Sequence, residues 1–182
     1  VMYWSAISHS LAHAGVPALI KWTKEGPIDK VRVALSKNNG AYVTIVSDLR
    51  GLETTWTPGV GDVTQDAKIR IYDSLDETVY GQTESFHIKA VFNVTSPATG
   101  NVWPVQSAQH IIWGTTGTVG SVKIEYTTVS NPIETDWVVI QNSYTNNGDC
   151  PWTVQNAVSN TCLVRVSDVN DSEAKGESGQ FK

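Results

Sequence analysis

The sequence predicts an all-β protein made of two tandem antiparallel β-sandwich domains. Three observations support this class: short segments in which apolar and polar residues alternate, turn-forming residues between them, and one pattern that occurs twice. Ile20–Leu35 and Ile111–Tyr126 both read apolar residue, any residue, tryptophan, a glycine-containing turn and an alternating strand. A repeat of about 90 residues is too long for a solenoid unit and is typical of a sandwich module.

The two copies match over most of their length. The matching pairs are Trp22 and Trp113, Val31 and Val122, Trp56 and Trp152, Arg70 and Arg165, Gly81 and Gly176, and Phe86 and Phe181. The offset is 91 residues at the first pair and 95 at the arginines, and small insertions of this kind belong in surface loops. We therefore expect one domain over residues 1–90 and a second over residues 91–182.

Each copy contains three clear strands in the same order. They are Lys30–Leu35, Ala41–Val46 and Ala67–Asp73 in the first copy, and Ser121–Tyr126, Asp136–Gln141 and Cys162–Asp168 in the second. Because side chains alternate along a strand, Val31, Val33 and Leu35 should face the core and Arg32 should face water. Glycine- and asparagine-rich turns separate the strands, at residues 37–41 and 145–149 for example.

The beginning of the first copy departs from this pattern. No opening strand is predicted there, and residues 8–15, SHSLAHAG, are the one stretch compatible with a short helix. The chain starts with Val1 rather than Met, which fits either a removed leader or an excerpt from a longer polypeptide.

Six of the seven tryptophans divide into two groups. The four matched ones are expected to fill the space between two sheets, where a large apolar ring buries most area. Trp4 and Trp103 have no match at the same offset, so we assign them, with Tyr144, to surface contacts.

Composition excludes some classes of partner. The net charge is −5, whereas a protein that binds nucleic acid presents a cationic face to the phosphates. No apolar run approaches the roughly 20 residues that a membrane-spanning helix needs. We therefore expect neither a nucleic-acid partner nor a membrane span.

A family resemblance follows from the second copy. It reads VTSPATGNVWPVQSAQHIIW over Val94–Trp113, then VKIEY, CPWTV and CLVRVSD. This resembles the immunoglobulin- or fibronectin-III-like repeats of bacterial cell-surface proteins and is similar to the Kre9/Knh1-type Ser/Thr-rich domain of cell-wall proteins. The resemblance covers Phe92–Lys182 well and Gly15–Ile88 moderately.

The resemblance implies a fold and a role. The fold would be two immunoglobulin-like sandwiches located outside the cell or on its surface. The role would be non-enzymatic, in a stalk, a surface layer or a self-assembling filament, with copies of itself or neighbouring surface-protein domains as partners. The alternative is a carbohydrate-binding accessory module of a secreted protein, in which Trp4, Trp103 and Tyr144 stack on cell-wall glycans.

Few residues suggest covalent or catalytic chemistry. Cys150 and Cys162 are the only cysteines, and they are predicted to form a disulfide in an oxidising compartment, with two buried free thiols as the alternative. Asn93 and Asn170 each begin an N-glycosylation triplet. No motif for a nucleophile, a phosphate loop or a metal occurs, so we predict no catalytic, cofactor or metal residues. The acidic stretch that follows Val166 is expected to be a solvated turn.

Overall fold

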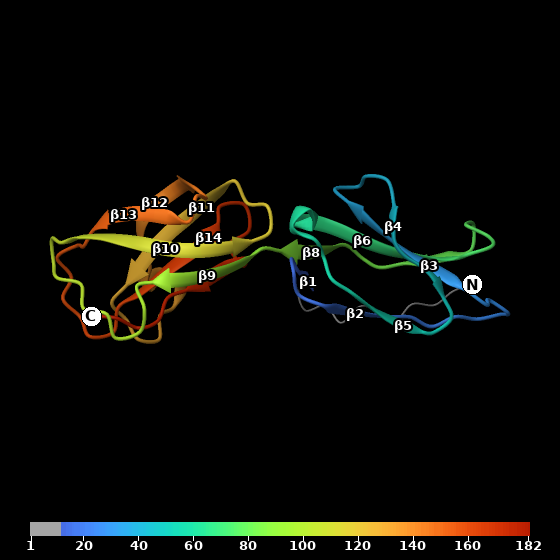
Figure 1. Cartoon of the computed structure of the whole chain (residues 1–182), viewed down its shortest axis with the longest axis horizontal. Coiled ribbons are helices and arrows are strands. Elements are labelled where there is room, and N and C mark those ends of the chain that lie inside the picture. The colour runs from blue at the N-terminus through green and yellow to red at the C-terminus, as the bar shows by residue number, and fades with distance from the viewer. Residues whose placement is uncertain (1–11) are drawn as a thin grey trace. The chain divides into compact units, whose positions relative to one another are not determined.

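The structure is a computed structural model that describes residues 12–182. The chain divides into two compact units: unit 1 ends at Lys89, and unit 2 comprises Ala90–Lys182 (Figure 1). Helix within residues 12–182 is confined to two single turns, η1 (Val60–Asp62) and η2 (Glu134–Asp136). None of the described helices has the length and hydrophobicity to cross a membrane.

Unit 2 is a sandwich of two antiparallel sheets. One sheet has the order β13–β10–β9 and the other β12–β11–β14–β15. The strands are β9 (Val91–Ser96), β10 (Ala108–Thr116), β11 (Ser121–Thr127), β12 (Val138–Thr145), β13 (Asp149–Thr153), β14 (Leu163–Asp168) and β15 (Lys175–Glu177). A three-stranded sheet packed on a four-stranded one in this connection order is the immunoglobulin-like arrangement.

Unit 1 has the same order of strand connections as unit 2, but the edge of its large sheet differs. Its small sheet pairs β2 with β5, and its large sheet has the order β1–β8–β6–β3–β4, with β7 also paired to β6. The strands are β1 (Ala12–His13), β2 (Ala18–Lys21), β3 (Val31–Lys37), β4 (Val43–Leu49), β5 (Glu53–Trp56), β6 (Thr64–Asp73), β7 (Tyr80–Gln82) and β8 (Phe86–Lys89). The predicted all-β class with two immunoglobulin-like sandwiches is confirmed.

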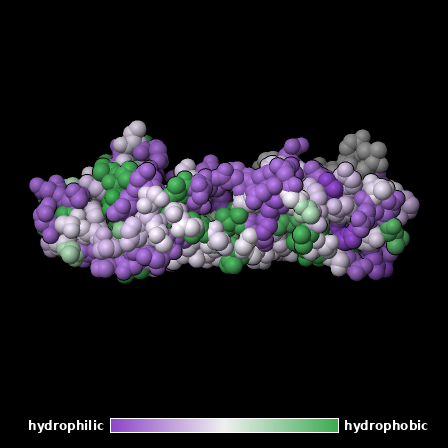
Figure 2. All heavy atoms as spheres, turned by 90° about the horizontal axis from the view of Figure 1, so that it is seen from above, coloured by the Kyte–Doolittle hydropathy of each residue, from purple (hydrophilic) through white to green (hydrophobic). Residues whose placement is uncertain are grey.

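The core has the predicted composition. Val31, Val33 and Leu35 are at most 5% exposed, whereas the neighbouring Arg32 is partly exposed. The matched tryptophans are all buried, with Trp22 2% and Trp113 3% exposed. Hydrophobic residues on the outer surface occur in small groups among hydrophilic side chains on the face drawn in Figure 2.

The start of unit 1 differs from the expectation. Ala12 and His13 form a strand rather than a helix, and this strand runs parallel to β8 with Ala12 opposite Ile88. The backbone N–H of Ala14 extends the pairing by donating to the carbonyl of Lys89 at 2.9 Å. Two residues are too few for a period-two pattern, so neighbouring sequence did not predict this strand.

The first and last segments of unit 2 also run in parallel. Gly176 lies against the backbone of Phe92, and a side chain at residue 176 would collide with it. Further along, the N–H of Gly100 donates to Gln180, and the N–H of Lys182 donates to Asn101. In unit 2, therefore, the chain begins at one end of the sandwich, where Phe92 meets Gly176, and finishes at the opposite end, where Trp103 meets Lys182.

Candidate functional site

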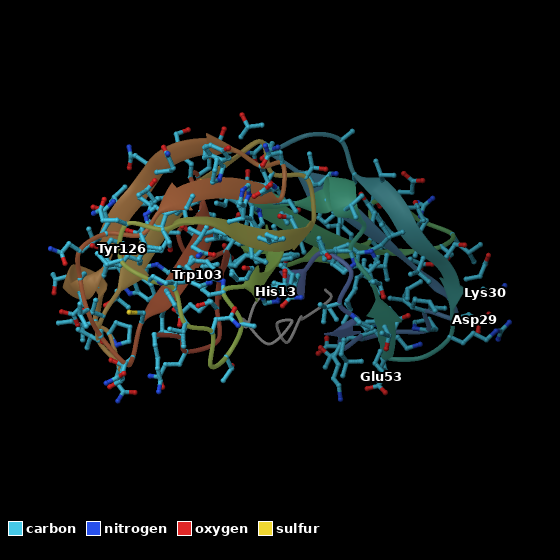
Figure 3. The ribbon with its side chains drawn as sticks, turned by 60° about the vertical axis from the view of Figure 1, so that its left-hand side comes forward. His13, Asp29, Lys30, Glu53, Trp103 and Tyr126 are labelled. Atoms are coloured by element: carbon cyan, nitrogen blue, oxygen red, sulfur yellow. The ribbon has the colours of Figure 1, made fainter. Side chains whose placement is uncertain are left out.

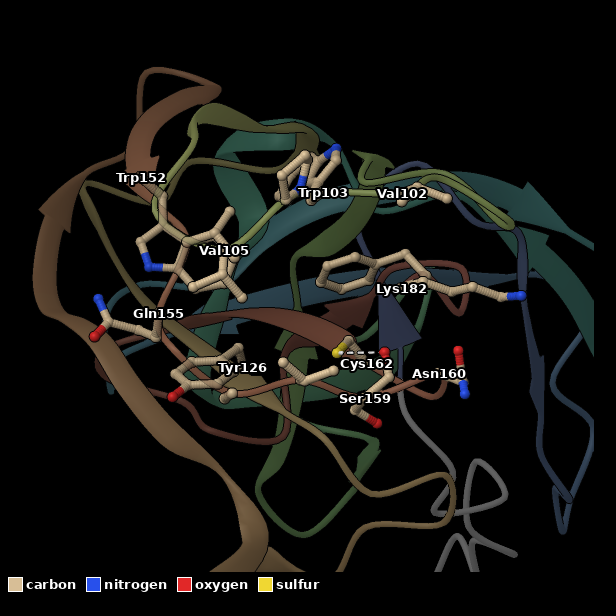
Figure 4. Close-up of a pocket in the computed structure, with 15 residues that line it drawn as sticks. Val102, Trp103, Val105, Tyr126, Trp152, Gln155, Ser159, Asn160, Cys162 and Lys182 are labelled. Atoms are coloured by element: carbon tan, nitrogen blue, oxygen red, sulfur yellow. Dashed lines mark hydrogen bonds between the residues drawn. The ribbon is translucent and has the colours of Figure 1, made fainter.

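The strongest candidate for a binding site is a hollow at the end of unit 2 where Lys182 lies (Figure 4). Its volume is about 310 Å³, at the lower limit of the roughly 300–1,000 Å³ typical of small-molecule sites. The lining is mainly apolar and aromatic, and includes Trp103, Tyr126, Trp152 and Phe181. A site of this size accepts one sugar ring or one large side chain.

The backbone holds Trp103 in place. The N–H of Trp103 donates to the carbonyl of Lys182 at 2.7 Å, so the connection between β9 and β10 is tied to the last residues of unit 2. Gly100, in the turn before it, has a φ of 81°, which favours glycine. Gly179 faces Thr99 so closely that any side chain at residue 179 would clash. The glycines of the S-P-x-x-G-x-x-W stretch and of the chain's final segment therefore allow this close approach.

Four aromatic rings pack around the hollow. The ring centroid of Trp103 lies 5.1 Å from that of Phe181 and 6.0 Å from that of Trp152. Tyr126 also packs against Trp152, with ring centroids 5.3 Å apart. Trp103 and Tyr126 are both labelled in Figure 3, on different elements of unit 2. The tilted rings fix one another and leave Trp103 partly exposed to the hollow.

The rim of the hollow carries polar side chains, but none of the described lining residues forms an acid–base pair. Exposed Gln155, Asn160 and Lys182 provide amide and ammonium donors at its edge. Neither a carboxylate nor a histidine belongs to the described lining, although general acid–base catalysis commonly uses such groups. The arrangement is suited to stacking and hydrogen bonding rather than to proton transfer.

The structure separates the three aromatic residues that the sequence grouped as surface contacts. Trp103 lines the hollow; Tyr144 lies on β12, opposite Val122, and is not part of the lining. Trp4 lies outside the described residues. Tyr126 and Phe181 were missed as site residues because each reads as an ordinary strand or edge position in the sequence.

The predicted disulfide is absent from the structure. Cys150 and Cys162 are both free thiols, 0% and 7% exposed. Burial raises the pKa of both thiols, and the neighbouring Asp149 raises that of Cys150 further. A raised pKa lowers the fraction of reactive thiolate at neutral pH. The open alternative, two buried thiols, is what the structure contains, because the two cysteines serve as small apolar core residues.

The two glycosylation triplets lie at the surface, whereas the acidic turn is only partly solvated, because Asp168 is 7% exposed. Asn93 on β9 and Asn170 after β14 are both exposed, so neither is sterically hidden. Asp168 accepts a hydrogen bond from the N–H of Asn170 at 2.8 Å, and Asp171 accepts one from Glu173 at 3.1 Å. These carboxylates make the local turn bonds that the sequence predicted.

An ion cluster with a buried pair, Arg165 and Glu125, lies on the outer face of the large sheet of unit 2. Arg165 donates to Glu125 at 2.6 Å and to Glu134 at 2.7 Å, and its side chain is only 4% exposed. The guanidinium also covers the ring of Trp137, 4.3 Å from the centroid. Hydrogen bonding to Arg165 lowers the pKa of Glu134, so this carboxylate remains charged and loses its stabilising contribution only as the pH falls through that lowered value.

No protein-family model and no curated protein matches this chain. Among solved structures, the fibronectin(III)-like modules of Clostridium thermocellum CbhA align with 97% of this chain and 92% of theirs, at 15% identity and a TM-score of 0.34. An ICAM-5 D1–D4 ectodomain fragment aligns with all of this chain and 53% of its own length, at 10% identity and a TM-score of 0.37. Three N-terminal domains of the bacteriophage RB49 Highly Immunogenic Outer Capsid protein align with 94% of this chain and 55% of theirs, at 12% identity and 0.31. Because these scores are low, the fold assignment rests on the strand order and pairing.

Proposed function

We propose that this chain is a non-catalytic structural module of an extracellular or cell-surface assembly, with domains at residues 1–90 and 91–182. The observation that carries the proposal is the parallel course of the first and last segments of unit 2, which start and finish at opposite ends of the sandwich. Units that begin at one end and finish at the other can be joined end to end without reversing the chain. This geometry suits a stalk, a surface layer or a filament of the bacterial surface type or the Kre9/Knh1 wall type.

Surface proteolysis tests this function. Intact cells that produce the protein are treated with an externally added protease, and an antibody raised against residues 91–182 then detects what remains. We expect the signal to disappear from intact cells while a cytosolic marker survives. Retention of the full signal on intact cells, with loss only after lysis, would contradict the extracellular role.

A second function, binding of a cell-wall glycan, is favoured by the hollow around Trp103. A sugar ring stacks its apolar face on an aromatic ring and places its hydroxyls against amide groups such as Gln155 and Asn160. In this form the chain would be an accessory module of a secreted protein.

Loss of glycan retention in a Trp103→Ala variant tests the second function. Affinity electrophoresis in gels that contain soluble cell-wall polysaccharides is expected to slow the wild type and not the variant. Tyr144→Ala is the matched control, because Tyr144 is not part of the lining and should leave retention unchanged. Equal mobility of the wild type with and without every polysaccharide would count against this function.

A further inference from the structure

An arginine between two tyrosines marks the outer face of β6 in unit 1. The guanidinium carbon of Arg70 lies 3.9 Å from the ring centroid of Tyr42 and 4.2 Å from that of Tyr80. Tyr80 is 46% exposed, and Tyr72 extends the same face along the strand. Arginine and tyrosine are, with tryptophan, the residue types enriched at the energetic centres of protein interfaces.

The internal repeat supplies a template for this site. In unit 1, Arg70 stands opposite Ala34 in the ladder between β3 and β6. In unit 2, Arg165 stands opposite Glu125 in the corresponding ladder between β11 and β14. The two arginines therefore occupy equivalent positions in the two units. Each guanidinium packs against an aromatic residue that immediately precedes an edge strand, Tyr42 before β4 and Trp137 before β12.

The two arginines differ in what neutralises them. Arg165 is bound by two carboxylates, whereas Arg70 donates from Nε and Nη2 to the neutral amide oxygen of Gln82, at 3.1 and 2.6 Å. Tyr42 also donates to this oxygen at 2.7 Å. Within residues 12–182, no carboxylate pairs with Arg70; its Nη1 has no acceptor there and is not a buried atom. This is the edge with which Arg165 binds Glu134.

The surrounding charges favour an anion. Lys68, two residues earlier on β6, donates to the amide oxygen of Asn39 at 2.9 Å rather than to a carboxylate. Arg32 is already paired with Glu77 at 2.6 Å. Two cations held by neutral amides, Lys68 and Arg70, thus outnumber the one carboxylate on this face of β6, that of Asp66.

We propose that this face of unit 1 binds an acidic segment of a protein partner, with a glutamate or aspartate carboxylate placed on the Nη1 edge of Arg70. The carboxylates of unit 2 are the model for the ligand: a glutamate side chain already binds the equivalent arginine in the same register. Pairing to arginine with two parallel hydrogen bonds adds both strength and direction. This inference goes beyond the proposed function, because it names the chemistry of a partner and holds wherever the chain is located.

The test measures binding of the purified chain to immobilised poly-L-glutamate at low salt by biolayer interferometry. Two variants remove the site in different ways. Arg70→Gln deletes the positive charge. Gln82→Glu keeps Arg70 but places an isosteric carboxylate where the amide now accepts its hydrogen bonds, so the charge of Arg70 is neutralised within the chain. We expect both to bind about tenfold more weakly or worse, as loss of a charge-assisted hydrogen bond predicts. Circular dichroism confirms folding, and Gln82→Glu keeps the test decisive if Arg70→Gln unfolds.

Matched controls make the same charge changes elsewhere. Arg50→Gln removes a guanidinium that pairs with Asp29, and Gln180→Glu adds a carboxylate to an exposed position in unit 2. Both should bind like the wild type. Equal weakening in the control variants would overturn the proposal, as would unchanged binding by Arg70→Gln and Gln82→Glu. Binding to polygalacturonate, a uronic-acid polymer, without binding to poly-L-glutamate would overturn the assignment to a protein partner.

Discussion

Replacing Arg165 with alanine is expected to destabilise unit 2 by about 3–5 kcal/mol, the cost typical of breaking a buried ion pair from one side. Glu125, whose side chain is 3% exposed, would stay charged and keep only its ion pair with Lys123, which is 32% exposed. Glu134 would lose little, because its side chain is 71% exposed. Hydrogen-exchange mass spectrometry of peptides from β11 and β14 measures the loss within unit 2 alone.

Two further variants separate this explanation from a general packing defect. The double variant Arg165→Ala with Glu125→Ala should recover part of the lost stability, since no buried charge then remains unpaired. The counterpart in unit 1, Arg70→Ala, should cost unit 1 about 1 kcal/mol or less, because no carboxylate depends on it. Equal losses for Arg70→Ala and Arg165→Ala would show that the carboxylates are not the cause.

Trp113→Ala is expected to destabilise unit 2 by about 3–5 kcal/mol, through lost apolar burial and the cavity left behind. Trp22→Ala should do the same to unit 1, since the two rings are buried to nearly the same extent. The phenylalanine variants distinguish the two sites. Trp113 donates from Nε1 to the amide oxygen of Asn146 at 2.8 Å, whereas Nε1 of Trp22 is buried without a partner among the described residues.

Trp113→Phe should therefore cost more than Trp22→Phe, by about 1 kcal/mol for the lost hydrogen bond. In unit 1, Gly51 occupies the turn that corresponds to Asn146, so this turn offers Trp22 no side-chain amide. Chemical denaturation followed by peptide-resolved hydrogen exchange gives the stability of each unit. Equal costs for both phenylalanine variants would contradict this role of Asn146.

The sequence was most informative where the pattern is local or repeated. Alternation along residues 31–35 identified the buried face of β3, since a strand turns its side chains to opposite faces in order. The repeat identified the paired core tryptophans, and the two copies have the same strand connections. The sequence did not predict β1, because a two-residue strand is defined only by its partner, β8.

The candidate sites depended on residues that are distant in sequence. The sequence identified Trp103 as a candidate contact residue because it has no counterpart in the first copy. The rings of Tyr126 and Phe181 come close to it only when the two sheets pack together. The thiols were misjudged for a related reason: the short loop between them predicted a disulfide, whereas the packed core leaves both side chains free.

By itself, the sequence determined the class of this protein: all-β, repeated, acidic and with core positions marked by tryptophan. Only the tertiary structure decided how matched residues differ in function. Arg70 and Arg165 are equivalent in the repeat, yet one meets a neutral amide and the other two carboxylates. The physical reason is that the partner of each arginine lies on a neighbouring strand. Arg165 and Glu125, for example, are about 40 positions apart in the sequence. The strand register rather than the local sequence therefore determines which residue each arginine meets.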